Sequence, residues 1–556
     1  MLKQDLFQTE QSQKRAFYCL WGFVIFVYLF FNIKIHMHES YVYSGAMEGF
    51  FDVTHGHYGV SPWLVNYNAF GNYHPDHPLL HLLGKLLKDF LALFSIQLPG
   101  IKAVSSINTI TGLMGGFFFY KIMKRFTKDQ IFATLMTVVL MFTDIFWFGA
   151  KSGEGYTSGQ CFNLLSMYLI FKYIEERKTS YIVYQAISLG VAMAFHSLFV
   201  FMLIPQFLIF WRADRKNILK VGSIIFAIIF AFGMAFYILP LYFYIGAKSL
   251  GEMIKVFLFY SDEMGVWTKS AYSLFSIVWG LILYPFVTGV YHLIYTVLEG
   301  YHAVWLFFRL VLIVIGYKAL KMALRDKAHE TRFMLCWFAI YFIFTSYILF
   351  LPYDITYWLF LMPAFIFILS FYFKKLKYRN AWALGLATLL FTGNFINDIY
   401  PKMIVNEDKY FFVDKISEEM KDESQMAIII FDSFAETSYL NYFGIVWAIK
   451  HHPSFADKHI EIIVDNVELD RKLQELTKDG KKLFVLRNSP GEAEKVEPMN
   501  KAIADIGYKL VKKTELRHHF NEKLDKTSEF QHVEAWYDLG PVGQSWLMHL
   551  ALYEKN

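Results

Sequence analysis

The stretch NYHPDHPLLHLLGKLLKDF, residues 72–90, decides how the rest of the chain is interpreted. It sets three histidines, two prolines and an aspartate directly against a leucine-rich run. In that run, which continues to residue 94, leucine and phenylalanine recur at helical spacing, while Lys85, Lys88 and Asp89 fall on the other face. A helix of this pattern lies in the plane of a membrane surface. We therefore expect an interfacial helix over 79–96, preceded by a polar loop over 35–78.

The composition is that of an integral membrane protein. Of 556 residues, 56% are hydrophobic and 19% aromatic, against 18% charged. A helix needs about 20 apolar residues to span the hydrocarbon. Stretches without charged residues cover 16–33, 104–120, 181–211, 221–247, 270–298, 333–353, 355–373 and 380–397. Further candidates are 131–148 with Asp144, 301–317 with Arg309, and the shorter 160–171. We expect a polytopic α-helical membrane protein with about 11–13 transmembrane helices.

The basic residues predict the orientation of these spans, because basic loops stay in the cytoplasm. With a cytoplasmic N-terminus, one side collects Lys14, Arg15, Lys121, Lys124, Arg125, Arg177, Lys178, Arg212, Arg215, Lys216, Lys318, Lys321, Arg325, Lys327, Lys374, Lys375, Lys377 and Arg379. The other side receives 35–102, 148–158, 246–272, the turn at Asp354 and everything after 397. The first span lacks a small-residue cleavage site, so we interpret it as a retained anchor. The absence of any glycosylation sequon favours a bacterial inner membrane.

The composition changes after Pro401. Charges become dense, and AIIIF at 427–431, IEIIV at 460–464 and KLFVL at 482–486 predict strands, with a helix over 467–480. We therefore expect a transmembrane domain over 1–400 and an extracytoplasmic, soluble α/β domain over 401–556. This second part contains neither a phosphate loop nor metal-ligand spacing. The three cysteines of the chain lie in hydrophobic runs and predict no disulfide framework.

Four motifs occur in a fixed order and on one side of the predicted membrane. They are HESYVYSGAMEGFF at 38–51, YHPDHPLLHLL at 73–83, AKSGEGYTSGQCFNLLSMYLIFKYIEE at 150–176 and YDITYWLFLMPAFIFIL at 353–369. Together they resemble the GT-C membrane glycosyltransferases over about residues 16–400. The nearest groups are the dolichyl-phosphate-mannose protein mannosyltransferases and the lipid A aminoarabinose transferases. The resemblance implies a GT-C-like catalytic domain over 1–400.

The resemblance also implies site residues. His38-Glu39 stands where the family carries an acidic pair, and Glu154 stands where it carries a second acid. Because the first acid of the pair is a histidine here, the catalytic role falls on Glu39 or on a nearby acid, Asp52 or Asp76. Two bland alternatives stay open: Glu39 as a solvated loop carboxylate, and Glu154 as the cap of a helix that starts near Ser158.

The chemistry that fits these residues is inverting glycosyl transfer. A sugar on a polyprenyl phosphate arrives from the bilayer, and a carboxylate deprotonates the acceptor as an oxocarbenium-like centre forms. Basic groups must stabilise the leaving phosphate, for which His74, His77, Lys269 and Arg309 are candidates. We also assign Asp76 and Tyr357 to substrate binding. A monophosphate leaving group requires no metal, and we predict neither a metal nor another cofactor.

We expect the partners to be a polyprenyl-phosphate sugar donor, membrane lipids, and an acceptor that is a lipid, a glycan or a protein. Nucleic acid is not among them. Two other classes compete with the enzyme. A transporter or lipid-sugar flippase shares the composition but usually places charges near the bilayer midplane, on broken helices and in repeated halves. A non-catalytic scaffold leaves the acid-rich first loop unexplained.

Overall fold

The structure of the chain, a computed structural model, divides into a helical unit and a unit built on a β-sheet, which are described separately. It describes residues 9–33, 77–245, 247–254, 300–344, 358–399, 403, 414, 416–418, 425–431, 459–463, 482–487, 501, 503–505, 507–518 and 546–555. For some of these, Arg309 among them, only the backbone is described.

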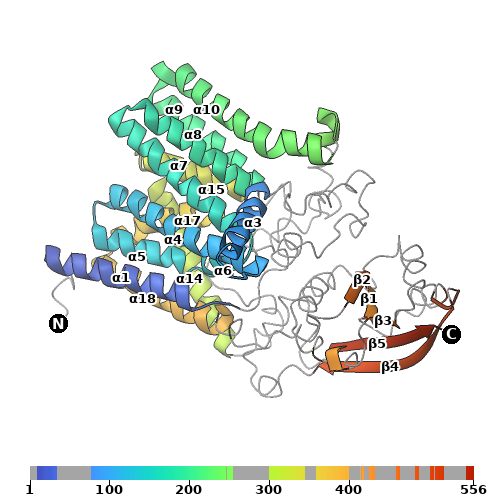
Figure 1. Cartoon of the computed structure of the whole chain (residues 1–556). Coiled ribbons are helices and arrows are strands. Elements are labelled where there is room, and N and C mark those ends of the chain that lie inside the picture. Colours follow the sequence, from blue (N-terminus) through green and yellow to red (C-terminus); the bar gives the residue numbers. More distant parts are fainter. Residues whose placement is uncertain are drawn as a thin grey trace. The chain divides into compact units, whose positions relative to one another are not determined.

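The helical unit is a bundle of roughly antiparallel helices (Figure 1). Its first part contains α1 (Glu10–Phe30), α3 (Pro78–Ala92), α4 (Gly100–Thr127), α5 (Gln130–Met141), α6 (Asp144–Lys151), α7 (Tyr156–Glu176) and α8 (Thr179–Phe195). Then follow η2 (Ser197–Met202), α9 (Leu203–Ala213), η3 (Arg215–Asn217), α10 (Ile218–Gly233), η4 (Met234–Ile238) and η5 (Leu241–Ile245). The last part contains α14 (Gly300–Ala323), α15 (His329–Ile343), α17 (Met362–Lys374), α18 (Arg379–Asn394) and η7 (Phe395–Ile399).

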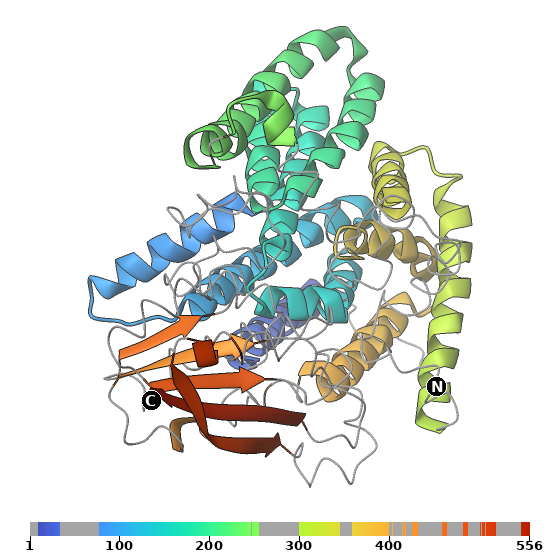
Figure 2. The ribbon, with the colours of Figure 1, turned by 90° about the vertical axis from the view of Figure 1, so that its right-hand side faces the viewer.

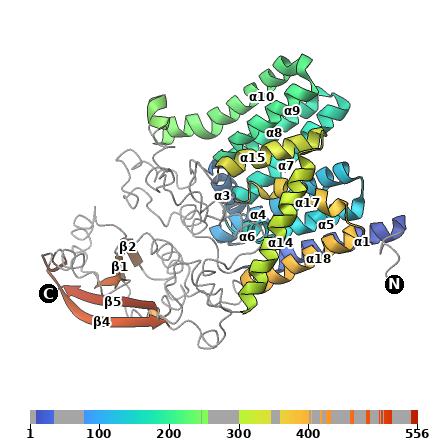
Figure 3. The ribbon, with the colours of Figure 1, turned by 180° about the vertical axis from the view of Figure 1, so that it is seen from behind.

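Helix α7 lies at the centre of this packing. It packs against α4 on one side and α8 on the other, and α8 in turn packs against α10. Helix α14 runs along α17, as Figure 3 shows from behind. Large aromatic side chains fill the core, with Phe119, Trp147, Trp337 and Tyr341 fully buried. The core therefore joins helices from both the early and the late parts of the chain.

Two predicted spans differ from a single straight helix. The run 181–211 forms two helices, α8 and then η2 with α9, which meet at His196. Basic residues predicted to be cytoplasmic stand at both ends of the run, Arg177 and Lys178 before it and Arg212 after it, and two helices fit that pattern. The run 131–148 is broken into α5 and α6, which are bent by 66°. Thr143 is the N-cap residue of α6, and Asp144 opens its first turn, a sequence that favours starting a new helix over continuing the old one.

The described residues support a membrane location in part. One continuous helix, Arg215–Phe243, is by itself long and apolar enough to cross a membrane, and the bent pair α5–α6 makes a second candidate. Only 11% of the most apolar window of Arg215–Phe243 is buried, and Leu219 and Phe226 are 84% and 70% exposed. Such an apolar outer face is stable against lipid. The number of 11–13 crossings stays a prediction.

A helix is present where we expected the surface helix: α3, which ends at Ala92, four residues before the predicted limit. Its place at a membrane surface stays a prediction. Its buried side, with Leu80 and His81, packs against α4, while Leu82, Leu86 and Phe90 are exposed. An apolar stripe on an otherwise charged helix suits insertion into the surface of a bilayer.

Ion pairs join helices at the end that we predict to be cytoplasmic. Arg125 at the end of α4 bonds to Glu175 of α7 and, through Nε at 2.9 Å, to Glu330 of α15. Arg379 at the start of α18 lies 2.6 Å from Asp129, the N-cap residue of α5. These pairs join helix ends other than the junction between α6 and α7 that is described below.

The second unit contains a five-stranded sheet with strand order β2-β1-β3-β5-β4 (Figure 2). The strands are β1 (Gln425–Phe431), β2 (His459–Ile463), β3 (Lys482–Arg487), β4 (Tyr508–His518) and β5 (Trp546–Lys555). Strands β2, β1 and β3 are parallel, whereas β5 runs antiparallel to both β3 and β4. The three predicted strands are confirmed. The predicted helix 467–480 lies outside the described residues, and the soluble, extracytoplasmic character of this part stays a prediction.

Candidate active site

The motif at 150–176 begins with a buried junction between α6 and α7. Helix α6 ends at Lys151 and α7 begins at Tyr156, so four residues, 152–155, make the connection. Glu154 in this connection is only 3% exposed. The N-cap residue of α7 is Gly155 and not Glu154, so the alternative in which Glu154 caps a helix starting near Ser158 is not what the structure shows.

Asn108 of α4 holds the backbone of this junction in place. Its side-chain nitrogen donates to the carbonyl of Ser152 at 2.8 Å and to that of Glu154. Ser158 at the start of α7 donates its hydroxyl proton to the side-chain oxygen of Asn108. Both the nitrogen and the oxygen of the Asn108 amide are therefore hydrogen-bonded. All three side chains, those of Asn108, Glu154 and Ser158, are buried. The position of Glu154 is therefore set by α4.

Gly155 allows three chain segments to meet. A Cβ atom on this residue would lie 2.4 Å from the carbonyl oxygen of Phe195, at the end of α8, and 2.9 Å from Nδ1 of His77. Both distances are far inside van der Waals contact. The start of α7, the end of α8 and the residue before α3 can approach this closely only because position 155 has no side chain.

The rings of His77 and His196 contact each other and the ring of Tyr156, which follows Glu154 by two residues. The ring centroids are 4.7 Å apart between the two histidines, 5.4 Å between His77 and Tyr156, and 4.5 Å between His196 and Tyr156. Phe360, just before α17, closes the group at 5.3 Å from His196. We call Glu154, Tyr156, His77 and His196 the junction cluster; each of them is at most 6% exposed.

Hydrogen bonds define the neutral tautomers of the two histidines. Nδ1 of His77 donates to the carbonyl of Phe195 at 3.0 Å, so Nε2 is the basic nitrogen of that ring. Nδ1 of His196 instead accepts the backbone N–H of Leu198 at 3.1 Å, which leaves the proton on Nε2. Burial lowers the pKa of His77 to about 4, against the opposing effect of the bond to Phe195. His77 is therefore neutral near pH 7.

A buried lysine joins the junction to the first helix. Lys151 is 2% exposed, and its ammonium donates to the backbone carbonyl of Tyr28 and, at 3.2 Å, to the side-chain oxygen of Asn32. Tyr28 lies in α1, and Asn32 follows its end. This places a cation next to the point where the chain leaves α1 for the predicted outer loop.

Of the predicted site residues, the structure describes the side chains of His77, which lies next to Gly155, and Glu154, which precedes Gly155 in the chain. Arg309 lies in α14, which packs against α17, but its side chain is outside the described residues. Glu39, Asp52, His74, Asp76, Lys269 and Tyr357 also lie outside them. Asp76 directly precedes His77 in the chain, and Tyr357 directly precedes Trp358, three residues from Phe360.

The roles of Asn108 and Lys151 were not predicted from the sequence. For His196, at the turn within the run 181–211, the sequence leaves open a core hydrogen bond or a site contact. A signal for Asn108 was present, since it is an amide within an apolar run. Lys151 lies inside the quoted motif, three residues before Glu154. Among the described residues, no group of three histidine, cysteine, aspartate or glutamate side chains is arranged to hold a metal ion.

No protein-family model and no curated protein matches this chain. Its structure nevertheless shares its fold with a solved structure, which bears out the mostly helical, GT-C-like membrane fold that we expected; the number of spans and the soluble α/β domain stay predictions. The solved structure that shows this is ArnT from Cupriavidus metallidurans bound to undecaprenyl phosphate, with a TM-score of 0.52, 11% identity and 98% of each chain covered. At this identity the likeness concerns the fold and not the activity.

Two other solved structures are less similar. The oligosaccharyltransferase of Archaeoglobus fulgidus, in complex with zinc and sulfate, has a TM-score of 0.49 at 12% identity, covering 87% of this chain and 69% of its own. ArnT in the apo state has a TM-score of 0.35 at 11% identity, covering 97% and 98%. We base no argument on these two.

Proposed function

We propose that this chain is a membrane glycosyltransferase that moves a sugar from a polyprenyl-phosphate donor to an acceptor on the extracytoplasmic side. The observation that carries the proposal is a buried acidic residue, Glu154, at a junction of three chain segments within a GT-C fold. Glutamate is almost never fully buried unless it is paired, and a buried titratable group at such a junction is a candidate for a functional site. The proposed location is a bacterial inner membrane, with residues 401–556 as an extracytoplasmic α/β domain.

In the proposed reaction, Glu39 is the general base, with Asp52 and Asp76 as the alternatives. The acceptor hydroxyl or amine attacks the anomeric carbon of the sugar as its proton passes to the carboxylate. The bond between that carbon and the phosphate oxygen breaks, and its electron pair leaves with the polyprenyl monophosphate. Attack opposite the leaving group inverts the anomeric configuration.

The junction cluster and Lys151 support this reaction from the protein side. Lys151 uses two donor bonds, to Tyr28 and Asn32, and an ammonium has three protons, so one remains to face a phosphate oxygen. Nε2 of His77 is the basic nitrogen of a buried ring, suited to accept a bond from a sugar hydroxyl. We assign Glu154 to the same site as the second acid, and His74, Lys269, Arg309 and Tyr357 to substrate binding.

The test is sugar transfer from a radiolabelled polyprenyl-phosphate donor in membranes that contain the full chain. We expect Glu39→Gln to lower the transfer rate about 10²–10⁴-fold while donor binding is retained, since removing a general base has effects of that size. Glu154→Gln should also lower the rate. Glu48→Gln, a change of another acid in the same predicted loop, serves as the matched control and should leave the rate unchanged.

Two results would overturn the proposal. The first is unchanged transfer in both Glu39→Gln and Glu154→Gln. The second is movement of the donor across the membrane by the wild-type chain with no transfer to any acceptor, which would support the flippase alternative.

A further inference from the structure

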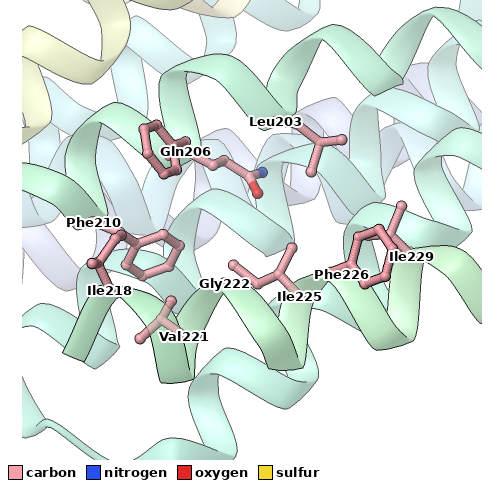
Figure 4. Close-up of a pocket in the computed structure, with 10 residues that line it drawn as sticks. Leu203, Gln206, Phe210, Ile218, Val221, Gly222, Ile225, Phe226 and Ile229 are labelled. Atoms are coloured by element: carbon pink, nitrogen blue, oxygen red, sulfur yellow. The ribbon is translucent and has the colours of Figure 1, made fainter.

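A groove between α9 and α10 lies apart from the junction cluster. Its volume is about 210 Å³, and it extends from Phe210 and Ile218 at one end to Leu203 and Ile229 at the other (Figure 4). Gln206 is the one polar side chain in its lining. The amide of Gln206 donates to Ser166 at 3.0 Å and accepts from Gln185, so its polar atoms are used within the protein. The groove is therefore apolar.

The length of the groove matches half a bilayer. From Ile218 to Ile229, α10 rises about 16 Å at 1.5 Å per residue. One leaflet of the hydrocarbon is about 15 Å thick. Gly222 widens the groove midway, since a Cβ at this position would meet nothing within 4 Å. One extended acyl chain fits this shape.

Positive charge gathers at the end of the groove near Phe210 and Ile218. Four basic side chains there are exposed: Arg212, Arg215, Lys216 and Lys220. The acid of the same turn, Asp214, is already bonded by Tyr173, by Arg177 at 3.2 Å and by Asn217 at 3.0 Å. In the part of the chain that the structure describes, no carboxylate lies within ion-pair distance of the four basic groups. The turn therefore keeps a surplus of positive charge.

Trp211 places this charge at the depth of lipid headgroups. The guanidinium of Arg215 lies over the Trp211 ring, 4.9 Å from its centroid. Tryptophan prefers the boundary between hydrocarbon and headgroups. The groove thus begins where a lipid phosphate would lie and continues where its acyl chain would lie.

We propose that this groove binds one anionic phospholipid of the cytoplasmic leaflet, with an acyl chain between α9 and α10 and the phosphate against Arg212 and Arg215. A zwitterionic lipid has the same chain but no net charge, so it gains less from the basic turn. The proposal needs the membrane location but not the transfer reaction, and the two can fail separately.

The test is native mass spectrometry of the full chain in detergent, titrated with phosphatidylglycerol or phosphatidylcholine of identical acyl chains. We expect the first phosphatidylglycerol to bind more tightly than the first phosphatidylcholine. Arg212→Gln with Arg215→Gln should reduce this preference by about fivefold per charge, which corresponds to about 1 kcal/mol for each basic residue. The control, Arg325→Gln with Lys327→Gln, removes two exposed charges from the α14–α15 turn and should retain the preference.

A second pair of variants tests the groove itself. Gly222→Leu fills the groove and should weaken the binding of both lipids, whereas Gly233→Leu changes a glycine of the same helix that also has open space around it, outside the groove. Equal binding of the two lipids by the wild type would overturn the proposal, as would equal losses in variant and control. The proposal would also be overturned if polyprenyl phosphate displaced bound phosphatidylglycerol at a lower concentration than additional phosphatidylglycerol does. The groove would then be a binding site for the donor.

Discussion

His77 makes the stability of the protein depend on pH. Burial lowers its pKa to about 4, while in the unfolded chain the pKa is close to the usual 6.5. Burial also lowers the pKa of His81, to about 3, with a smaller contribution from His77. Between the folded and unfolded values, the unfolded chain binds more protons than the folded one. Stability from these residues is therefore complete above about pH 6.5 and is lost as the pH falls towards 4.

We expect acidification from pH 7 to pH 5 to lower the free energy of unfolding by about 2 kcal/mol per buried histidine. The measurement is the thermal unfolding midpoint of the purified chain in detergent at each pH. His77→Asn keeps a donor for the Phe195 carbonyl and removes the titrating group, so its midpoint should fall less steeply. A midpoint that is higher at pH 5 than at pH 7, or an unchanged slope in His77→Asn, would contradict this assignment.

Asn108 is a second residue whose effect can be measured. Asn108→Ala leaves the buried carbonyls of Ser152 and Glu154 without this donor, and each lost partner costs about 1–3 kcal/mol. We expect a loss of about 3 kcal/mol in stability and a fall in sugar transfer. Ser105→Ala, one turn earlier in α4, removes a local bond to Lys102 and should change either quantity little. Equal effects of the two substitutions would show that Asn108 does not hold the junction.

Among the elements, the start of α7 meets the end of α8 at Gly155. Gly155→Ala adds a Cβ that backbone atoms of Phe195 obstruct, so the two helix ends must separate. We expect a loss of about 2 kcal/mol or more in stability, typical of overpacking, and reduced transfer. Gly22→Ala in α1 is the control, because its Cβ meets nothing and alanine favours the helix by about 1 kcal/mol. Thermal unfolding of both variants measures the difference; a stable, active Gly155→Ala would rule out the close approach.

The elements show which sequence signals are reliable. Short apolar runs bounded by polar residues predicted β1, β2 and β3 almost to the residue. Strand β4 was not predicted because it lies at the edge of the sheet, with Leu510 and Val511 exposed. Its alternation of side chains between the two faces also shifts at an irregularity between Leu510 and Lys512. Strand β5 is an apolar run of a kind that periodicity alone cannot separate from a buried helix.

The candidate site was predictable only in part. Glu154 was identified from a motif that resembles a family's, and His77 as a candidate basic group. The structure places His77 next to Gly155, which follows Glu154, while their roles in a site stay predictions. The contact of His77 with the carbonyl of Phe195 could not be predicted from the sequence, because it joins residues more than a hundred positions apart. The partners of Lys151 and Asn108 depend in the same way on how α1, α4 and α6 pack, which no local pattern encodes.

At the scale of the whole molecule, the predicted orientation can be tested with single cysteines. In a chain whose three native cysteines are replaced, Glu39→Cys should react with an impermeant thiol reagent on intact cells, because the first loop is predicted to be outside. Arg325→Cys, in the α14–α15 turn, should react only after the membrane is opened. Labelling of residue 39 only after opening would place the proposed base in the cytosol and end the proposed mechanism.

The length of the helix Arg215–Phe243 makes bilayer thickness a variable for this protein. Its 29 residues measure about 43 Å, well beyond the roughly 30 Å of an average hydrocarbon layer, so a membrane-spanning placement of this helix requires it to tilt or the bilayer to thicken. It packs against α8, whose C-cap residue is His196. In such a placement, shorter lipid tails increase the tilt of the helix and longer tails reduce it. The fatty acids that a cell makes would therefore change the distance between this helix and His196.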